Sequence, residues 1–187
     1  MPQALPIVKE PHAVLRKLAH DITLSEISSK KIQNLIASMK ETLKGTTDGV
    51  GLAAPQVGET LRIFIVSEEA EEIDRHEAAK RKQKDSHDHE EIRSYPVRPW
   101  QYYVFINPKA ISRSRKKLEG AEGCLSVPGI FGSVKRHEKI TVQAYDEHGK
   151  KFTCGKSRFF ARVMQHELDH LEGTLFIDTA THIVKPS

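Results

Sequence analysis

The five residues His166-Glu167-Leu168-Asp169-His170 carry the side chains of this chain that are best suited to chemistry. In a helix, residues four apart lie on one face about one turn apart, so both imidazoles can reach a single metal ion. Glu167 stands beside them, near enough to take a proton from a water molecule without binding the ion itself. Because so short a string can also arise by chance in a charged helix, the motif needs support from the rest of the chain.

A catalytic metal centre of this kind needs a third protein ligand and an open position for water. Downstream of the motif, Glu172 is too close on the same helix, which leaves Asp178 and His182 as the ligands that a zincin-type peptidase would use. Upstream, Cys124 lies in a stretch flanked by glycine and proline between predicted strands, and it is a candidate for the third ligand. The alternative is that Cys124 is only a small buried hydrophobic side chain. A thiolate with two imidazoles favours zinc or ferrous iron over magnesium or calcium.

A helix must position the two histidines, and apolar spacing predicts one over residues 158–172, ended by Gly173. A second helix is predicted within residues 25–44, where Ser28 is the expected N-cap and Gly45 follows the last turn. A short helix is expected at 13–19. Between these elements lies a run of small residues, 49–58, which would let a ligand or a second backbone approach closely, or would serve as an ordinary tight loop.

Three buried strands are predicted, at residues 61–66, 102–106 and 140–145. Asn107-Pro108 is expected to end the second strand, and the turn after the third leads to a partner strand at about 151–154. Strands separated by few helices favour an α+β fold over a doubly wound sheet.

A charged insertion at about 68–93 differs in composition from the rest of the chain. Its acidic residues come first and its basic residues later, which suits a helix dipole, and Glu77 can pair with Arg81 one turn on. This pattern favours a solvated, partly helical excursion between two strands over a binding arm.

Composition restricts the class of protein. The length of 187 residues fits one domain, and 38% hydrophobic residues exclude a disordered or membrane chain. No secretory signal is visible at the N-terminus. Two cysteines in a chain without such a signal are more often reduced thiols than a disulfide, so we expect a cytoplasmic protein. We expect Cys154 to be a small buried hydrophobic residue. The net charge of +4 carries little weight as a sign of nucleic-acid binding.

Three segments together resemble the peptide deformylase family. They are G-φ-G-φ-A-A-P-Q at residues 49–56, E-G-C-φ-S at 122–126 and Q-H-E-φ-D-H at 165–170, where φ is apolar. All three match at every motif position and in the family's order, and the resemblance extends from about residue 7 to 178. It implies a single catalytic domain over residues 1–187, with antiparallel and mixed sheets packed around a central metal-binding helix.

The resemblance also implies an activity, which is removal of the N-formyl group from the formylmethionine of new polypeptides, with release of formate. Cys124, His166 and His170 would then be the metal ligands, and Glu167 the general base and later the general acid. The side-chain amide of Gln56 and the backbone N–H of Leu125 would stabilise the oxyanion.

For the substrate, the resemblance implies an extended peptide that adds alongside Gly49 and Gly51. Val50 and Val163 are the expected walls of the methionine pocket, and Phe131 its rim. The resemblance further implies that Asp169 pairs with Arg136, whereas helical spacing suggests that Arg162 contacts Glu122.

Ferrous iron is the ion that the resemblance implies, with Zn²⁺, Ni²⁺ or Co²⁺ as alternatives. The expected partners are N-formylmethionyl peptides and a transient ribosome contact, with no specific nucleic acid, no membrane and a monomeric state. The charged insertion, and a chain that ends soon after residue 178, depart from the family pattern. Two other functions stay open, a zincin-type metallopeptidase and an inactive relative that binds the ribosome or another partner.

Overall fold

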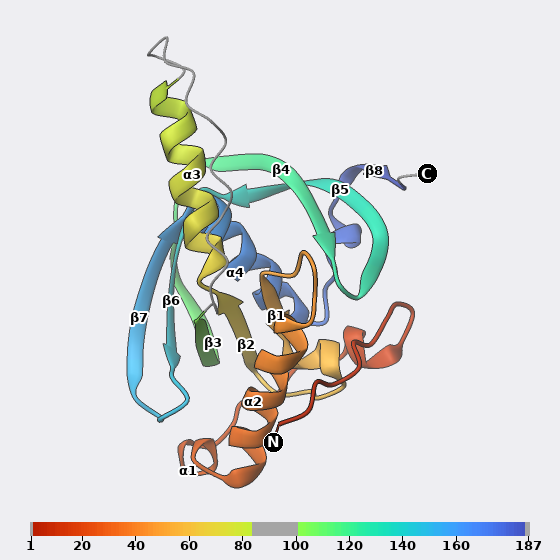
Figure 1. Ribbon diagram of the computed structural model, residues 1–187, viewed down its shortest axis with the longest axis vertical. Coiled ribbons are helices and arrows are strands. Elements are labelled where there is room, and N and C mark those ends of the chain that lie inside the picture. The colour runs from red at the N-terminus through yellow and green to blue at the C-terminus, as the bar shows by residue number, and fades with distance from the viewer. Residues whose placement is uncertain (1, 84–100, 186–187) are drawn as a thin grey trace.

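The computed structural model describes residues 2–83 and 101–185 and contains two antiparallel sheets with a helix between them (Figure 1). The larger sheet has the strand order β1-β2-β3-β6-β7, and the smaller has the order β4-β5-β8. The strands are β1 (Gly51–Ala53), β2 (Ile63–Ser67), β3 (Tyr102–Arg113), β4 (Lys117–Cys124), β5 (Val127–His137), β6 (Lys139–Tyr145), β7 (Lys151–Ser157) and β8 (Thr181–Val184). The helices are α1 (Leu24–Ile27), α2 (Lys30–Lys44), α3 (Glu69–Gln83) and α4 (Arg158–Leu171), with short 3₁₀ turns η1 (Ala13–Arg16), η2 (Ala54–Val57) and η3 (Phe176–Asp178).

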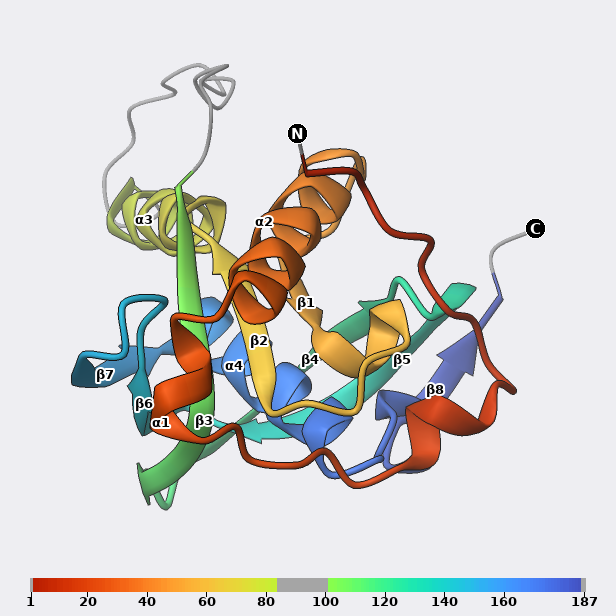
Figure 2. The same cartoon turned by 90° about the horizontal axis from the view of Figure 1, so that it is seen from below.

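Both faces of the larger sheet are covered by helices. The side chains of β2 point alternately to the two faces, and all of them are buried. Phe64 and Val66 belong to a core shared with α4, whereas Ile63 and Ile65 belong to a core shared with α2. Successive side chains of a strand point to opposite faces, so a strand that is apolar throughout must be buried on both. Figure 2 shows the resulting layers, with α2 outside the larger sheet and α4 between the two sheets.

A third, smaller core fills the space under the second sheet. It joins η1 and η3 to β5 through six buried residues, namely Val14, Leu15, Val127, Val134, Leu175 and Phe176. This core attaches the N-terminal segment and the chain after α4 to the sheet that carries Cys124. The α+β expectation, with a central helix between antiparallel sheets, is confirmed.

The helices confirm most of the predicted boundaries. Helix α4 starts and ends within a residue of the expected positions, and Gly173 follows it with φ +70°. The N-cap of α2 is Ser29 rather than Ser28, because the Oγ of Ser29 accepts the N–H of Ile32. Residues 24–27 form a separate helical turn, and the helix expected at 13–19 is only the 3₁₀ turn η1.

The prediction that Asn107-Pro108 ends a strand is wrong. Strand β3 continues to Arg113 through a shift in register after Ile106. Asn107 adopts φ +49°, and its side-chain amide exchanges two hydrogen bonds with the backbone of Ile22, of 2.8 and 2.6 Å. The bulge therefore accommodates the proline, which cannot donate to the ladder.

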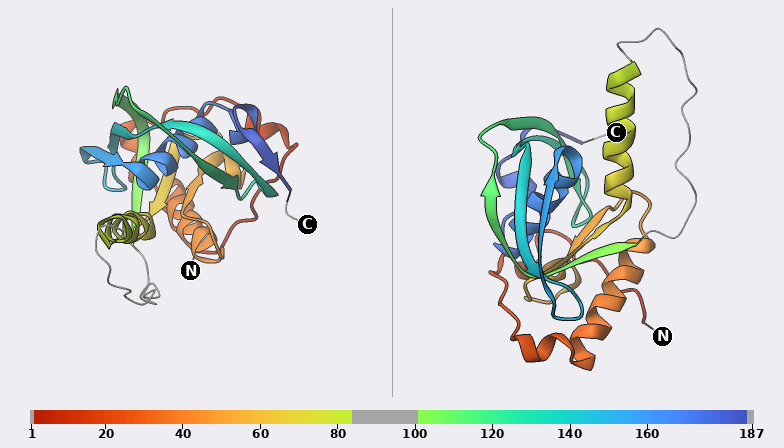
Figure 3. Two further views of the ribbon diagram at one scale, coloured as in Figure 1. Left: turned by 90° about the horizontal axis from the view of Figure 1, so that it is seen from above. Right: turned by 90° about the vertical axis from the view of Figure 1, so that its left-hand side faces the viewer.

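The charged insertion is helical over its first half, as α3. The expected pair forms, with a guanidinium nitrogen of Arg81 2.9 Å from Oε2 of Glu77. The helix is not simply solvated, however, because Ala70 is 0% exposed and belongs to the core around α4. Its far end extends away from the body of the protein (Figure 3). Residues 84–93 of the insertion lie outside the described residues.

Candidate metal centre

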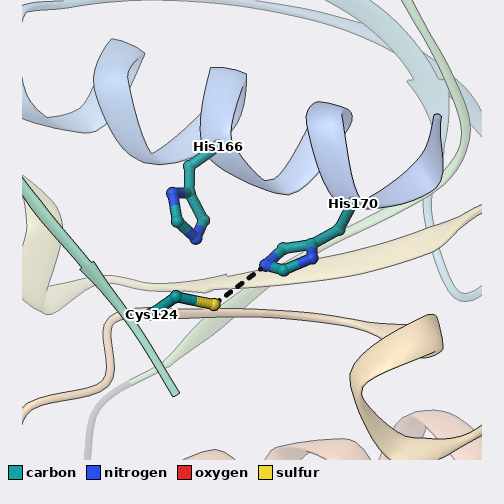
Figure 4. A group of neighbouring side chains, drawn as sticks. All are labelled: Cys124, His166 and His170. Atoms are coloured by element: carbon teal, nitrogen blue, oxygen red, sulfur yellow. Dashed lines mark hydrogen bonds between the residues drawn. The ribbon is translucent and has the colours of Figure 1, made fainter. Parts of the chain in front are cut away.

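Three predicted ligands meet at one point. The sulfur of Cys124 and one nitrogen each of His166 and His170 all lie within 4.8 Å of one another (Figure 4). Cys124 is the last residue of β4, and the two histidines lie one turn apart on α4. The Cys124 sulfur is 3.2 Å from Nε2 of His170. A thiol and two imidazoles that converge in this way form the donor set that zinc and ferrous iron accept, so the residues fit a divalent ion.

The ring of His166 is oriented by Glu122. Nδ1 of His166 donates to Oε2 of Glu122 at 3.0 Å, which leaves Nε2 to face the cluster. Burial lowers the pKa of His166, but contacts with Cys124 and Glu122 outweigh it and raise this pKa to about 10 in the metal-free protein. A cation that binds here therefore displaces a proton from His166.

Glu122 is the centre of a buried charge network. Arg136 donates two hydrogen bonds to its carboxylate, of 2.8 and 2.9 Å, and Arg162 donates a third at 2.8 Å. Burial raises the pKa of Glu122, but Arg136 and His166 outweigh this and lower it to about 2. Arg136 also reaches Asp169 at 2.5 Å. The expected contacts Asp169–Arg136 and Arg162–Glu122 are thus both present.

Replacing Arg136 with methionine should lower the free energy of unfolding by about 3 kcal/mol, because removing one partner of a buried ion pair leaves the other uncompensated. The lower end of the usual range applies, since Glu122 keeps Arg162 and His166. Urea denaturation of the metal-loaded protein measures this loss. Lys135→Met is the matched control, on the adjacent position of β5 with a 72% exposed side chain, and equal losses in both variants would contradict the prediction.

Glu167 follows His166 on α4 and is hidden from bulk solvent. It is 3% exposed, and its Oε2 has no hydrogen-bond partner among the described residues. Burial, the largest cause, raises the pKa of Glu167 to about 7. A carboxylate whose pKa is near neutrality and whose oxygen is unpartnered can both accept and return a proton.

The carboxylate of Glu167 rests against the backbone of Gly51. A Cβ at residue 51 would lie 2.4 Å from Oε1 of Glu167 and 2.9 Å from Cγ1 of Val163. The glycine is therefore required by close approach of a side chain.

If Glu167 is the expected base, Gly51→Ala should lower the kcat of the reaction by about 10²-fold, and it should also lower the melting temperature by a few degrees. The added methyl displaces the carboxylate of Glu167, and a base moved by about 1 Å loses its geometry for proton transfer. The methyl also overlaps with Cγ1 of the buried Val163, which the packed core relieves only in part. Steady-state kinetics and thermal unfolding of the metal-loaded protein test this together. Gly155→Ala in β7 is the control, because its Cβ would meet only Thr141 Oγ1 at 3.6 Å, and a kcat equal to that of the control would refute the argument.

Gln56 is held so that its side-chain amide nitrogen points toward the sulfur of Cys124. Oε1 of this 1% exposed residue accepts the N–H of Ala53 at 2.9 Å, which fixes the orientation of the amide. Nε2 then lies 3.2 Å from Oγ of Ser126 and 3.5 Å from Sγ of Cys124. Leu125 follows the cysteine, and its carbonyl accepts a hydrogen bond from the ammonium of Lys9. Both predicted oxyanion donors therefore belong to residues beside the thiol.

A cavity of about 440 Å³ opens onto these groups. The five residues expected to contact the substrate all line it, namely Gly49, Val50, Gly51, Phe131 and Val163. Phe131 is 41% exposed, which agrees with a place at the rim. The cavity is also lined by Phe159 and Arg162 from the first half of α4, and by Lys9 and Asp48.

The ligands that a zincin would use lie elsewhere. Oδ2 of Asp178 is 2.5 Å from Arg16, and His182 is exposed on β8. Neither belongs to the group of donor residues around the two histidines. Cys154 is a half-buried free thiol on β7, whose pKa is raised chiefly by burial.

Sequence reasoning did not assign Glu122 its contact with His166. The available signal was its position two residues before Cys124, which places both side chains on one face if the segment is a strand. That strand was not predicted, and neither was its partner β5, so the signal could not be used.

Comparison with known proteins agrees with this geometry. The family model described as polypeptide deformylase matches residues 4–185. Peptide deformylase 1A, chloroplastic, of Solanum lycopersicum is 39% identical over 94% of this chain, and the chain spans only 60% of that relative. Peptide deformylase 1 of Vibrio vulnificus is 38% identical over 93% of the chain and 84% of the relative.

Solved structures show the same fold. The Met-Ala-Ser-bound crystal structure of class I type b peptide deformylase from Acinetobacter baumannii has a TM-score of 0.75 and 30% identity. The match covers 96% of this chain and 99% of that chain.

Within the described residues, no helix has the length and apolar character needed to cross a bilayer.

Proposed function

The chain belongs to the polypeptide deformylase family, and on this premise we propose that it removes the N-formyl group from the N-terminal formylmethionine of new polypeptides and releases formate. One observation carries the proposal. A sulfur and two imidazoles converge beside a buried, unpartnered carboxylate, at a cavity whose wall includes Gly49 and Gly51.

Cys124, His166 and His170 would hold one divalent ion. When bound, the ion supplies Lewis acidity, which lowers the pKa of water and polarises a carbonyl group. We propose ferrous iron, with Zn²⁺, Ni²⁺ or Co²⁺ as alternatives, because a thiolate and two imidazoles accept all of them.

Glu167 accepts a proton from the attacking water and returns it to the amine that leaves. The pKa of about 7 that burial gives this carboxyl group suits both transfers near neutral pH. The neighbouring backbone of Gly51 limits where the carboxylate can lie, so it stays directed at the cavity.

Gln56 and Leu125 stabilise the negative charge that develops on the formyl oxygen. The bond from Ala53 N–H to Oε1 directs the amide nitrogen of Gln56 toward the thiol, and the backbone N–H of Leu125 lies beside it in the chain. Losing one such donor costs about 3–4 kcal/mol of transition-state stabilisation in comparable sites.

The peptide would add as a strand along β1. This strand is at one end of the larger sheet and pairs only with β2 among the described residues, so its other edge can accept an extended chain. Val50 and Val163 then form the wall of the methionine pocket and Phe131 its rim.

Further parts of the proposal concern the setting. We propose a monomeric, cytoplasmic enzyme with one catalytic domain over residues 1–187, which contacts the ribosome only transiently and needs no specific nucleic acid and no membrane.

Release of formate from formyl-Met-Ala-Ser by the iron-loaded protein, purified without air, tests the activity. Acetyl-Met-Ala-Ser and an internal peptide without a formyl group are the controls. Formate release from the first peptide alone supports the proposal. Cleavage of the internal peptide would indicate a zincin-type peptidase, and bound metal without any turnover would indicate an inactive binding relative.

A further inference from the structure

Helix α3, the first half of the charged insertion, supplies the N-terminal cap of the helix that carries the metal-site histidines. Oδ1 of Asp74 accepts the N–H of Phe159 at 2.9 Å, and Oδ2 accepts the N–H of Phe160 at 3.0 Å. The first of these bonds spans 85 residues of the chain. The local N-cap, Ser157, makes no side-chain capping bond, so Asp74 takes the place that the residue before a helix normally fills.

A second set of contacts, one turn before Asp74, joins α3 to strands β3 and β7 of the larger sheet. The carboxylate of Glu71 accepts the hydroxyl of Tyr103 at 2.9 Å and pairs with the ammonium of Lys156. That ammonium lies 4.7 Å from the centre of the Phe160 ring, over its face. Glu71 and Asp74 are three residues apart and thus lie on one face of α3, which is the face turned toward α4.

The backbone where α4 begins is strained. Arg158 has φ +56°, in the left-handed region that a side chain with a Cβ rarely adopts. Such a conformation persists only where the surroundings hold it in place. Here the N–H of Arg158 bonds to the carbonyl of Glu138 at 2.7 Å, and Asp74 holds the next two amides.

The first turns of α4 form part of the substrate cavity. Phe159, Arg162 and Val163 line it at one end, and His166 and Glu167 line it further along the helix. His166 follows Phe159 by seven positions, roughly 10 Å along the helix axis. A shift in the first turn should therefore move the cavity wall more than the metal site.

We propose that Asp74 is a positioning residue, which fixes the first turn of α4 and through it the wall of the cavity that receives the substrate side chain. The inference rests on the proposed deformylase function, because the cavity is assigned to a peptide on that ground. It gives the charged insertion a role within its own chain, where its composition alone favoured a solvated excursion.

Three variants of the iron-loaded protein test this role with formyl-Met-Ala-Ser as substrate. Asp74→Ala removes both bonds, and Asp74→Asn keeps one carbonyl acceptor. Glu77→Ala is the matched control, since Glu77 is exposed on the same helix and, within the part of the chain that the structure describes, pairs with Arg81 of that helix. Metal content and hydrogen exchange at the amides of residues 159 and 160 are measured for each variant.

In Asp74→Ala we expect KM to rise by about 3- to 30-fold, the range that the free energy of a lost helix cap allows, with kcat and metal content close to the unsubstituted protein. The two amides should exchange faster, Asp74→Asn should restore part of the change, and Glu77→Ala should show none. An unchanged KM in Asp74→Ala would overturn the proposal. So would a parallel loss of kcat and metal, because it would mark Asp74 as a general stabiliser. If Asp74→Ala does not fold, Asp74→Asn against Glu77→Ala decides in the same way.

The exchange measurement and calorimetric binding of the tripeptide Met-Ala-Ser do not depend on turnover. If the unsubstituted protein released no formate, the proposed function would fail. In that case, faster exchange and weaker tripeptide binding in Asp74→Ala would still support the positioning role, and no change in either would refute it.

Discussion

Replacing Glu167 with glutamine is expected to leave the metal in place and to lower kcat by about 10²–10⁴-fold, the usual contribution of a general base. The amide has the size of the carboxyl group and keeps its place against Gly51, but it cannot accept the proton of the attacking water. Steady-state formate release together with metal analysis of the same preparation measures the effect.

The variant should also be at least as stable as the unsubstituted protein when both are metal-free. Burial raises the pKa of Glu167 to about 7, so ionisation of this carboxyl group near neutral pH destabilises the folded protein. A neutral amide at the same place does not have this effect. Glu119→Gln serves as control, since Glu119 is an exposed residue of β4 that bonds Ser133. A near-normal kcat in the Glu167 variant would defeat the assignment of the base.

Replacing Cys124 with alanine is the second change with a large expected effect, on metal binding. Four-ligand zinc sites bind with about 10–16 kcal/mol, so one ligand contributes roughly 3 kcal/mol and its loss weakens binding about a hundredfold. The two histidines would remain, with Nδ1 of His166 still bonded to Glu122. Competition for the metal with a chelator of known affinity measures the difference.

Cys154→Ala provides the matched control, since this second free thiol lies on β7, outside the group of donor residues. Its metal affinity should equal that of the unsubstituted protein. A zincin would retain its metal in the Cys124 variant, because its third ligand lies downstream of the histidines. Full retention in that variant would therefore exclude the thiolate site.

Local patterns were enough to predict the helix that carries both histidines. Its apolar spacing and the glycine after it depend on residues within a few turns, and α4 begins and ends close to the expected positions. The residues alone left Cys124 open as a third ligand beside Asp178 and His182, and the family resemblance then implied Cys124. The structure brings Cys124 and the two histidines together, while their roles as ligands stay predictions.

Contacts between distant parts of the chain were the features that the sequence did not reveal. Burial alternates along β4, but its less exposed positions hold Gly120, Glu122 and Cys124 as well as Leu118, and the buried positions of β5 include Gly132 and Arg136. The sequence therefore shows no apolar alternation that would mark the two strands as a hairpin. The bond between Glu122 and His166 depends on that hairpin. The cap that Asp74 provides for α4 likewise depends on how α3 packs, which no spacing within the insertion encodes.

The bulge at Asn107 shows a different limit. Asparagine and proline in sequence are ordinary signals for the end of a strand. Here hydrogen bonds to the backbone of Ile22 hold the asparagine in a left-handed conformation, and the strand resumes beyond it. Tertiary contacts outweighed a local preference, which is the common reason for such errors.

The donors of the candidate metal centre belong to two bodies that share no strand. Cys124 ends a strand of the smaller sheet, and the histidines lie on the helix that packs against the larger one, at a separation of up to 46 positions in the chain. An ion held by all three would act as a cross-link, and closing a loop of that length is worth about 4 kcal/mol in the chain-entropy model. If the metal were scarce, the metal-free protein would lose its activity. It would also lose much of its resistance to unfolding and proteolysis, because the same ion would support both.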